Sequence, residues 1–336
     1  MSQHDAYGYA VARIRAMEHQ LLDSSVLQRM IDAEDLETAF KILGETSYST
    51  TLTLNSGVYD FDKLLESELK SKYSEIESFI PEKRLIDLLR YQYDFHNVKV
   101  LIKSAFNVEK GGQKRWDFLT SLGSFSVESL INDIELEEYK FLPFDLNNLL
   151  PKCIAIWEQT NNILDVERLL DDRMYQVMLE TAKELDMPET LSWIRSRIDG
   201  ENIRALLRLK RFNYDASNAL LFMHLGGKID VNSLVALINE PFESWKRFFE
   251  YTEYGLTINS IDAGGTFSDL ILSLEKVLDD YYTHKLAASR YSYNAPENIL
   301  AYLWDKEMEV KNVRMILVAK TSGGNKEQLR RLLRNV

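Results

Sequence analysis

Apolar side chains recur every three or four residues along most of the chain, which is the pattern of helices with one buried face. The first series begins near Tyr7 and predicts an amphipathic helix that contains Val11, Ile14, Met17, Leu21 and Leu22. A second series predicts a single helix from Val26 to Leu43, with Gly44 as its C-terminal stop. Residues 47–59 are rich in serine and threonine and predict a loop, after which the helical pattern resumes.

A short motif occurs three times in the helical stretches. Each stretch opens on a proline followed by glutamate, at Pro81, Pro188 and Pro296, as helices do when proline takes the first position and an acid the first turn. Each then reaches an asparagine that follows an acidic residue by three positions. The three acid–asparagine pairs are Asp94 with Asn97, Asp199 with Asn202, and Glu309 with Asn312.

The positions that follow each asparagine are repeated as well. A β-branched residue comes first, then a base (Lys99, Arg204 or Arg314), and two aliphatic residues follow at the fourth and fifth positions, so that one helical stripe is buried. The asparagines are 105 and 110 residues apart, and a pair of glycines follows each copy. We therefore predict three similar helical repeats, residues 1–117, 118–227 and 228–336, with a linker near residues 111–126.

Composition favours an all-α fold with a soluble exterior. The 336 residues include only 14 glycines and 6 prolines, too few for a loop-rich β-sandwich or barrel, whereas good helix formers are abundant. The formal charge of −12 repels phosphate backbones and anionic lipid headgroups. Nucleic acid is therefore excluded as a partner, and so is direct electrostatic docking on a membrane.

The remaining global features place the chain in the cytoplasm. Its one cysteine, Cys153, lies in an apolar run and is expected to be a buried small hydrophobe. Residues 1–9 lack the features of a secretory signal, and no stretch approaches 18 apolar residues. Any membrane association must then come through partner proteins, at the cytoplasmic face.

Signatures of catalysis, cofactor binding or metal binding are missing from the sequence. The five histidines never fall three or four residues apart, and there is no phosphate loop, dinucleotide fingerprint or nucleophile elbow. The turn at residues 261–266 has two adjacent glycines, but neither a strand nor a lysine accompanies them, so we interpret it as a loop between helices. We predict no catalytic, cofactor or metal residues.

The acid–asparagine–base motif has two interpretations. In the architectural one, the asparagine caps or satisfies backbone groups at a helix break, and the flanking charges pair across neighbouring helices. In the other, Lys99, Arg204 and Arg314 point to a common axis and hold an acidic partner. We favour the architectural interpretation, because a catalytic site would hardly occur three times in one chain.

The opening run from Tyr7 to Met17 resembles the start of the C subunit family of vacuolar/archaeal-type ATPases, whose member in eukaryotic vacuolar enzymes is called d. The segment from Met30 to Tyr48 and the repeated Asp/Glu-x-x-Asn-x-Lys/Arg motif resemble that family too. The second copy departs most from the pattern, because its helix before the asparagine is two residues shorter.

The resemblance implies an all-α funnel of three helical repeats around a pseudo-threefold axis. Its wide end would rest on the ring of membrane proteolipid subunits, and its cavity would receive the foot of the central shaft. Such a protein is not catalytic but passes torque between ATP turnover and ion movement, as one copy per complex. We expect the isolated chain to be a monomer that hydrolyses no nucleotide.

Two other classes of function stay open at the level of sequence. A generic helical-repeat scaffold for soluble proteins would form an open superhelix without a central cavity. An all-α enzyme would need acids or histidines from different repeats to converge in one pocket. The choice between proton and sodium coupling is not encoded in this chain, because that choice lies in the membrane ring.

Overall fold

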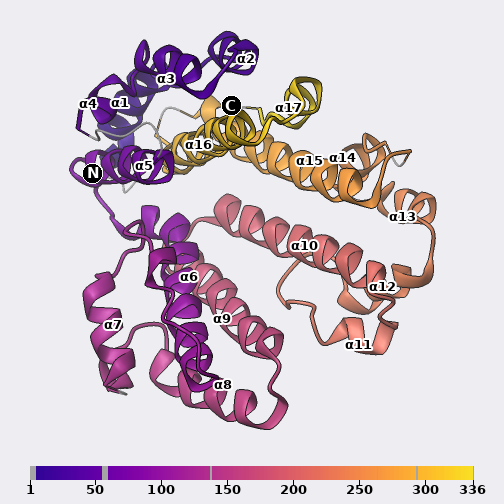
Figure 1. The fold of residues 1–336 in the computed structure, drawn as a ribbon. Coiled ribbons are helices and arrows are strands. Elements are labelled where there is room, and N and C mark those ends of the chain that lie inside the picture. Colours follow the sequence, from indigo (N-terminus) through magenta and orange to yellow (C-terminus); the bar gives the residue numbers. More distant parts are fainter. Residues whose placement is uncertain (1–4, 55–59, 137, 263, 293, 336) are drawn as a thin grey trace. The chain divides into compact units, whose positions relative to one another are not determined.

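The computed structural model describes residues 5–54, 60–136, 138–262, 264–292 and 294–335, and every regular element within them is helical (Figure 1). The all-α prediction is confirmed. The α-helices are α1 (Gly8–Glu18), α2 (Ser24–Asp32), α3 (Leu36–Gly44), α4 (Ser49–Leu54), α5 (Phe61–Glu77), α6 (Arg84–Glu109), α7 (Val127–Glu135), α8 (Leu146–Thr160), α9 (Ile163–Glu184), α10 (Pro188–Arg211), α11 (Ala216–Leu220), α12 (Val231–Val235), α13 (Phe242–Phe249), α14 (Gly255–Asn259), α15 (Phe267–Ala287), α16 (Glu297–Ser322) and α17 (Lys326–Leu332). Short 3-10 helices are η1 (Asp5–Tyr7), η2 (Trp116–Phe118), η3 (Tyr139–Phe141), η4 (Ala236–Asn239) and η5 (Ala288–Tyr291).

The chain forms two compact units, each of which combines segments far apart in sequence. Unit 1 contains Met1–Ile86, Ile203–Ala216 and Leu234–Val336, so both ends of the chain belong to it. Unit 2 contains Asp87–Asn202 and Ser217–Ser233. No described helix is long and apolar enough to cross a membrane.

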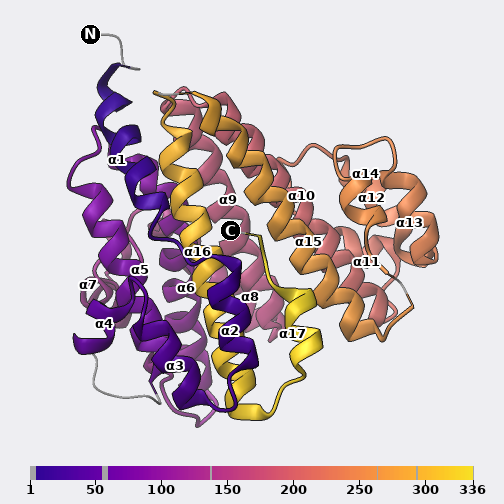
Figure 2. The same ribbon diagram turned by 90° about the horizontal axis from the view of Figure 1, so that it is seen from above.

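Helix α16 forms the centre of unit 1. It packs against α5, α15 and α1, and also contacts α2 and α3 (Figure 2). Nearly every residue from Glu297 to Leu317 is buried, including Ile299, Leu300 and Ile316. A helix covered on all sides carries its polar groups into the interior, where each of them needs a partner.

In unit 2 the core is built from α6, α8, α9 and α10. Leu88 and Phe95 of α6, Leu170 of α9 and Trp193 of α10 have no solvent exposure beyond 1%. Helices α8 and α9 pack against each other. Cys153 on α8 is buried as expected, and burial raises the pKa of its thiol to about 11, so the thiol stays protonated and unreactive.

Two local predictions were wrong. The single helix expected from Val26 to Leu43 is two helices, because the Asp35 carboxylate accepts a hydrogen bond from the Thr38 backbone N–H (2.8 Å) and so begins α3 anew. The loop expected at residues 47–59 contains helix α4, and residues 55–59 lie outside the described residues.

Candidate functional site: the repeated acid–asparagine clasp

The three motif asparagines, which lie on α6, α10 and α16, make the same hydrogen bonds. Each side-chain amide donates to the backbone carbonyl of a residue 22 or 23 positions later and accepts from the N–H of that same residue. Asn97 pairs in this way with Thr120 (2.8 and 2.9 Å), Asn202 with His224 (2.8 and 2.7 Å), and Asn312 with Arg334 (2.9 and 2.9 Å). All three asparagines are buried.

The motif acids of the first two copies hold the same returning segment a few residues further on. Asp94 accepts from the Ser124 hydroxyl (2.6 Å) and the Phe125 N–H (3.1 Å). In the second copy, Asp199 accepts from the Lys228 N–H (3.0 Å) and the Ile229 N–H (3.1 Å). We call the acid, the asparagine and the backbone that they bind a clasp. It anchors the returning chain along the motif helix.

A helix begins immediately after the clasped backbone. Ser126, which follows Phe125, accepts from the Ser129 N–H (3.4 Å) at the start of α7. Asp230, which follows Ile229, accepts from the Ser233 N–H (2.9 Å) at the start of α12. The clasp and the N-terminal cap thus fix where the next helix starts and in which direction it leaves.

The third clasp is completed by the other end of the chain. Glu309 accepts from the backbone N–H of Leu22 (2.5 Å) and from the hydroxyl of Tyr48 (2.7 Å). Leu22 is followed by Asp23, whose carboxylate accepts from the Val26 N–H (3.0 Å) at the start of α2. Leu22 therefore has the position in the third clasp that Phe125 and Ile229 have in the other two.

The third clasp also contains a buried ammonium group. Lys306 is 1% exposed, and its Nζ lies 2.7 Å from a Glu309 oxygen and 2.9 Å from an oxygen of Glu68 on α5. Two carboxylates share one cation there, so the Tyr48 hydroxyl and the Leu22 N–H stabilise the remaining negative charge. Burial and the neighbouring Glu309 raise the pKa of Tyr48, which stays a neutral donor.

The bases of the motif form a further set of contacts, between consecutive copies. Lys99 of the first motif lies 2.7 Å from Asp171 on α9, the helix before the second motif. Arg314 of the third lies 2.8 Å from Asp62 on α5, the helix before the first. These ion pairs are partly exposed, so each contributes little to stability. They do show which helices are neighbours.

In the second motif the base Arg204 is half-buried on α10. Arg208, one turn later on the same helix, lies 2.7 Å from Glu275 on α15, the helix before the third motif. These three ion pairs join α6 to α9, α10 to α15, and α16 to α5.

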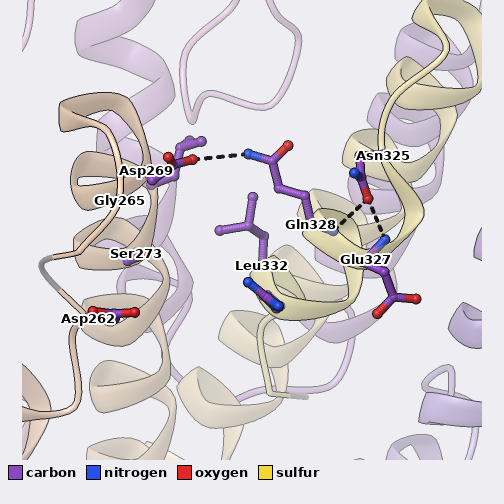
Figure 3. A pocket seen from close by; sticks show the side chains of 10 residues that line it. Asp262, Gly265, Asp269, Ser273, Asn325, Glu327, Gln328 and Leu332 are labelled. Atoms are coloured by element: carbon purple, nitrogen blue, oxygen red, sulfur yellow. Dashed lines mark hydrogen bonds between the residues drawn. The ribbon is translucent and has the colours of Figure 1, made fainter.

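The turn with two glycines begins α15 and borders an open hollow of about 490 Å³ opposite α17 (Figure 3). Asp269, in the first turn of α15, forms a capping box with Thr266, and its carboxylate accepts a hydrogen bond from the Gln328 amide (3.4 Å). Asp262 and Glu327 also line the hollow, against one base, Arg331. This lining repels phosphate, which agrees with a loop between helices; Ala263 lies outside the described residues.

Metal ligands do not converge in the part of the chain that the structure describes. No group of three or more histidine, cysteine, aspartate or glutamate side chains is placed to hold an ion there. The one buried histidine among the described residues, His224, has its ring nitrogen Nδ1 2.6 Å from an Asp172 oxygen, and its backbone completes the second clasp. The contacts of His224 therefore stabilise the fold.

A sequence model of the ATP synthase (C/AC39) subunit family matches residues 10–332 of the chain, which is nearly its whole length. The chain belongs to this family. The C/AC39 relatives include the C subunit of the V-type sodium ATPase of Enterococcus hirae, 25% identical over 96% of both chains. The C subunit of the A-type ATP synthase of Methanocaldococcus jannaschii is 25% identical over 97% of this chain and 86% of its own. The corresponding protein of Methanococcoides burtonii is 25% identical over 97% and 94%.

Sequence reasoning located the nine motif residues of this C/AC39 chain but not the groups they bind. Sequence reasoning also missed that Gly123 and Gly227 must be glycine for the clasp to form. A Cβ at Gly123 would lie 2.3 Å from the Asp94 carboxylate, and a Cβ at Gly227 would lie 2.1 Å from the Asp199 carboxylate. Lys306, Tyr48 and Leu22 were also missed. One signal was available for the third clasp: its acid is glutamate where the other two are aspartate.

Replacing Asn312 by leucine is expected to lower the free energy of unfolding by about 2–4 kcal/mol, since a buried N–H and a buried carbonyl of Arg334 would each lose their partner. Asn202→Leu should act alike at His224. Urea denaturation measures the change, and binding to partner subunits is measured below the transition. An unchanged midpoint together with lost binding would instead assign the asparagines to a partner surface.

Asp305, next to the third clasp on α16, gives a prediction about pH. It is 1% exposed, and burial raises its pKa to about 7, although Arg290 opposes the shift; Glu18 and Glu309 add to it. Between about pH 4 and 7 the folded chain retains a proton that the unfolded chain has lost, so stability falls as pH rises through this window. Asp305→Asn should lie close to the parent near pH 4 and exceed its thermal midpoint by a growing margin up to pH 8. Equal midpoints at both values would contradict this.

Proposed function

We propose that the chain is a non-catalytic coupling subunit in the central stalk of a rotary V/A-type ATPase. It seats the central shaft on the membrane proteolipid ring and transmits torque between ATP turnover and ion transport. The observation that carries the proposal is the family match over residues 10–332, together with relatives named as C subunits of V-type and A-type enzymes. The chain would lie at the cytoplasmic face as a peripheral member of the complex.

We further propose that residues 1–117, 118–227 and 228–336 are three repeats around a pseudo-threefold axis, with a central space that receives the shaft. Two features support a closed arrangement over an open array. The third clasp takes its backbone from Leu22, and the ion pair of Arg314 leads back to Asp62. An open array would leave its last copy without a following copy to contact.

The clasps suit a part that transmits torque. Buried, fully hydrogen-bonded links between each motif helix and the next segment resist relative movement, because opening one exposes several unsatisfied polar groups at once. Close-packed helices supply the remaining stiffness. The motif residues then stabilise contacts within the chain, and other surfaces of the chain contact the shaft and the ring.

Co-purification tests the proposal. The chain, tagged at one end, is recovered from detergent-solubilised membranes of its source organism, and the accompanying proteins are identified by mass spectrometry. We expect shaft and proteolipid subunits to be recovered together with one copy of this chain per complex. Recovery of soluble partners alone, while the membrane ATPase purifies without this chain, would favour a generic helical scaffold. The purified chain alone should be monomeric and should release no phosphate from ATP.

A further inference from the structure

Unit 2 has an open groove of about 540 Å³ along the C-terminal half of α6, lined by both apolar and polar side chains. Ile102 and Phe106 of α6 form its buried floor. Trp116 of η2, Ile134 of α7 and Ile154 of α8 line its sides. The groove thus lies among five elements of one unit, since Tyr139 of η3 also lines it, and its volume is in the range of binding pockets.

Apolar side chains continue from the groove onto the surface around it. Val108 is 43% exposed, Trp116 is 36% exposed, and Leu136, next to the lining residue Glu135, is 66% exposed. Single exposed apolar residues are ordinary, but a hollow with an apolar floor and apolar edges is typical of an interaction site.

The rim of the groove is acidic. It carries Glu109, Glu135 and Glu158 against one base, Lys114. Lys114 is already engaged, since it pairs with Glu135 and lies 4.7 Å over the Trp116 ring. Glu158 is exposed and forms no ion pair with the described residues. The rim therefore offers an excess of negative charge to whatever fills the apolar floor.

We propose that this groove binds an amphipathic helix of another protein, with an aliphatic stripe flanked by lysine or arginine. The lining of α6 runs from Leu101 to Glu109, about 12 Å at 1.5 Å per residue, which is two turns of a bound helix. Helices bind such grooves through side chains spaced three, four and seven residues apart. The acidic rim selects the basic flanks and disfavours acidic helices. This site is separate from the clasps and does not depend on the coupling role.

The test uses the purified full-length chain and a synthetic helical peptide with a leucine stripe and lysine flanks. Titration is followed by calorimetry and by tryptophan fluorescence, because Trp116 lines the groove. Two matched peptides serve as controls, one with glutamate in place of the lysines and one with serine in place of the leucines. We expect saturable 1:1 binding of the first peptide only, weakened by salt.

Three protein variants locate the binding site. Ile134→Asp should weaken binding about tenfold or more by removing apolar contact, and Glu158→Lys should weaken it about threefold to tenfold. Glu240→Lys makes the same change of charge in an exposed residue of unit 1 and should leave binding within about twofold. Equal losses in the two charge variants, tight binding of the acidic peptide, or no saturable binding would each overturn the proposal. Circular dichroism confirms that each variant is folded.

Discussion

Replacing Glu309 by alanine is expected to lower the free energy of unfolding by about 3–5 kcal/mol, the largest effect we predict for one side chain. The substitution removes an acceptor from the Leu22 N–H and the Tyr48 hydroxyl, and it removes one of the two carboxylates beside Lys306. All of these groups are buried, so water cannot replace the lost contacts without opening the unit. Urea denaturation followed by circular dichroism measures the change.

The same variant should also free the start of the chain. Glu309 joins residues 287 positions apart through its bond to Leu22, so its loss should expose the segment around α1 and α2 to protease at urea concentrations where the rest of the chain is folded. Glu240→Ala, at an exposed position, is the matched control and should change neither quantity. A Glu309→Ala protein that unfolds at the parent's urea midpoint would show that the third clasp does not stabilise the fold.

Gly227→Ala is expected to lower the free energy of unfolding by about 3 kcal/mol. A Cβ at this position would lie 2.1 Å from Oδ1 of Asp199, far inside contact distance. Asp199 is fully buried and holds the Lys228 and Ile229 N–H groups, so it cannot move aside without releasing them. Gly123→Ala meets the same obstacle 2.3 Å from Oδ1 of Asp94 and should act in the same direction.

Gly8→Ala is the matched control for these glycines. A Cβ there would meet no atom within 4 Å, and Gly8 begins helix α1. Alanine favours helix over glycine by up to about 1 kcal/mol, so this variant should be neutral or slightly more stable. If all three glycine variants lose the same stability, the loss at positions 123 and 227 would come from the backbone conformation of glycine and not from contact with the aspartates.

The sequence predicted the helical class correctly because the spacing of apolar residues and the abundance of good helix formers are local information. It failed where a single polar group interrupts a continuous apolar pattern. Asp35 precedes and caps the second helix, yet the apolar residues on both sides continue the same series, so the break between α2 and α3 was not visible. In α4, serines and threonines form a helix despite their low propensity, because the segment packs on α3 and α5.

The motif residues were found because they recur, but their partners could not be. The stretch at 111–126 was predicted to be a linker, since glycine and polar residues are frequent there. Its backbone is fixed to α6 by Asn97 and Asp94. Any residue type can supply the backbone N–H and carbonyl that a side chain binds, so the sequence at that position does not reveal the hydrogen bond. Thr120, His224 and Arg334, which have equivalent positions, share no chemistry for this reason.

The use of Leu22 in the third clasp has a consequence for synthesis on the ribosome. Glu309 is synthesised 287 residues after Leu22, and leaves the exit tunnel correspondingly later. All residues of unit 2 are available once Ser233 has emerged, so that unit can fold while α15 and α16 are still being made. Until α16 has been made, helices α1 and α2 lack the contacts that they form with it in the folded unit. We expect nascent chains released before residue 309 to bind chaperones through this early segment, and full-length chains not to do so.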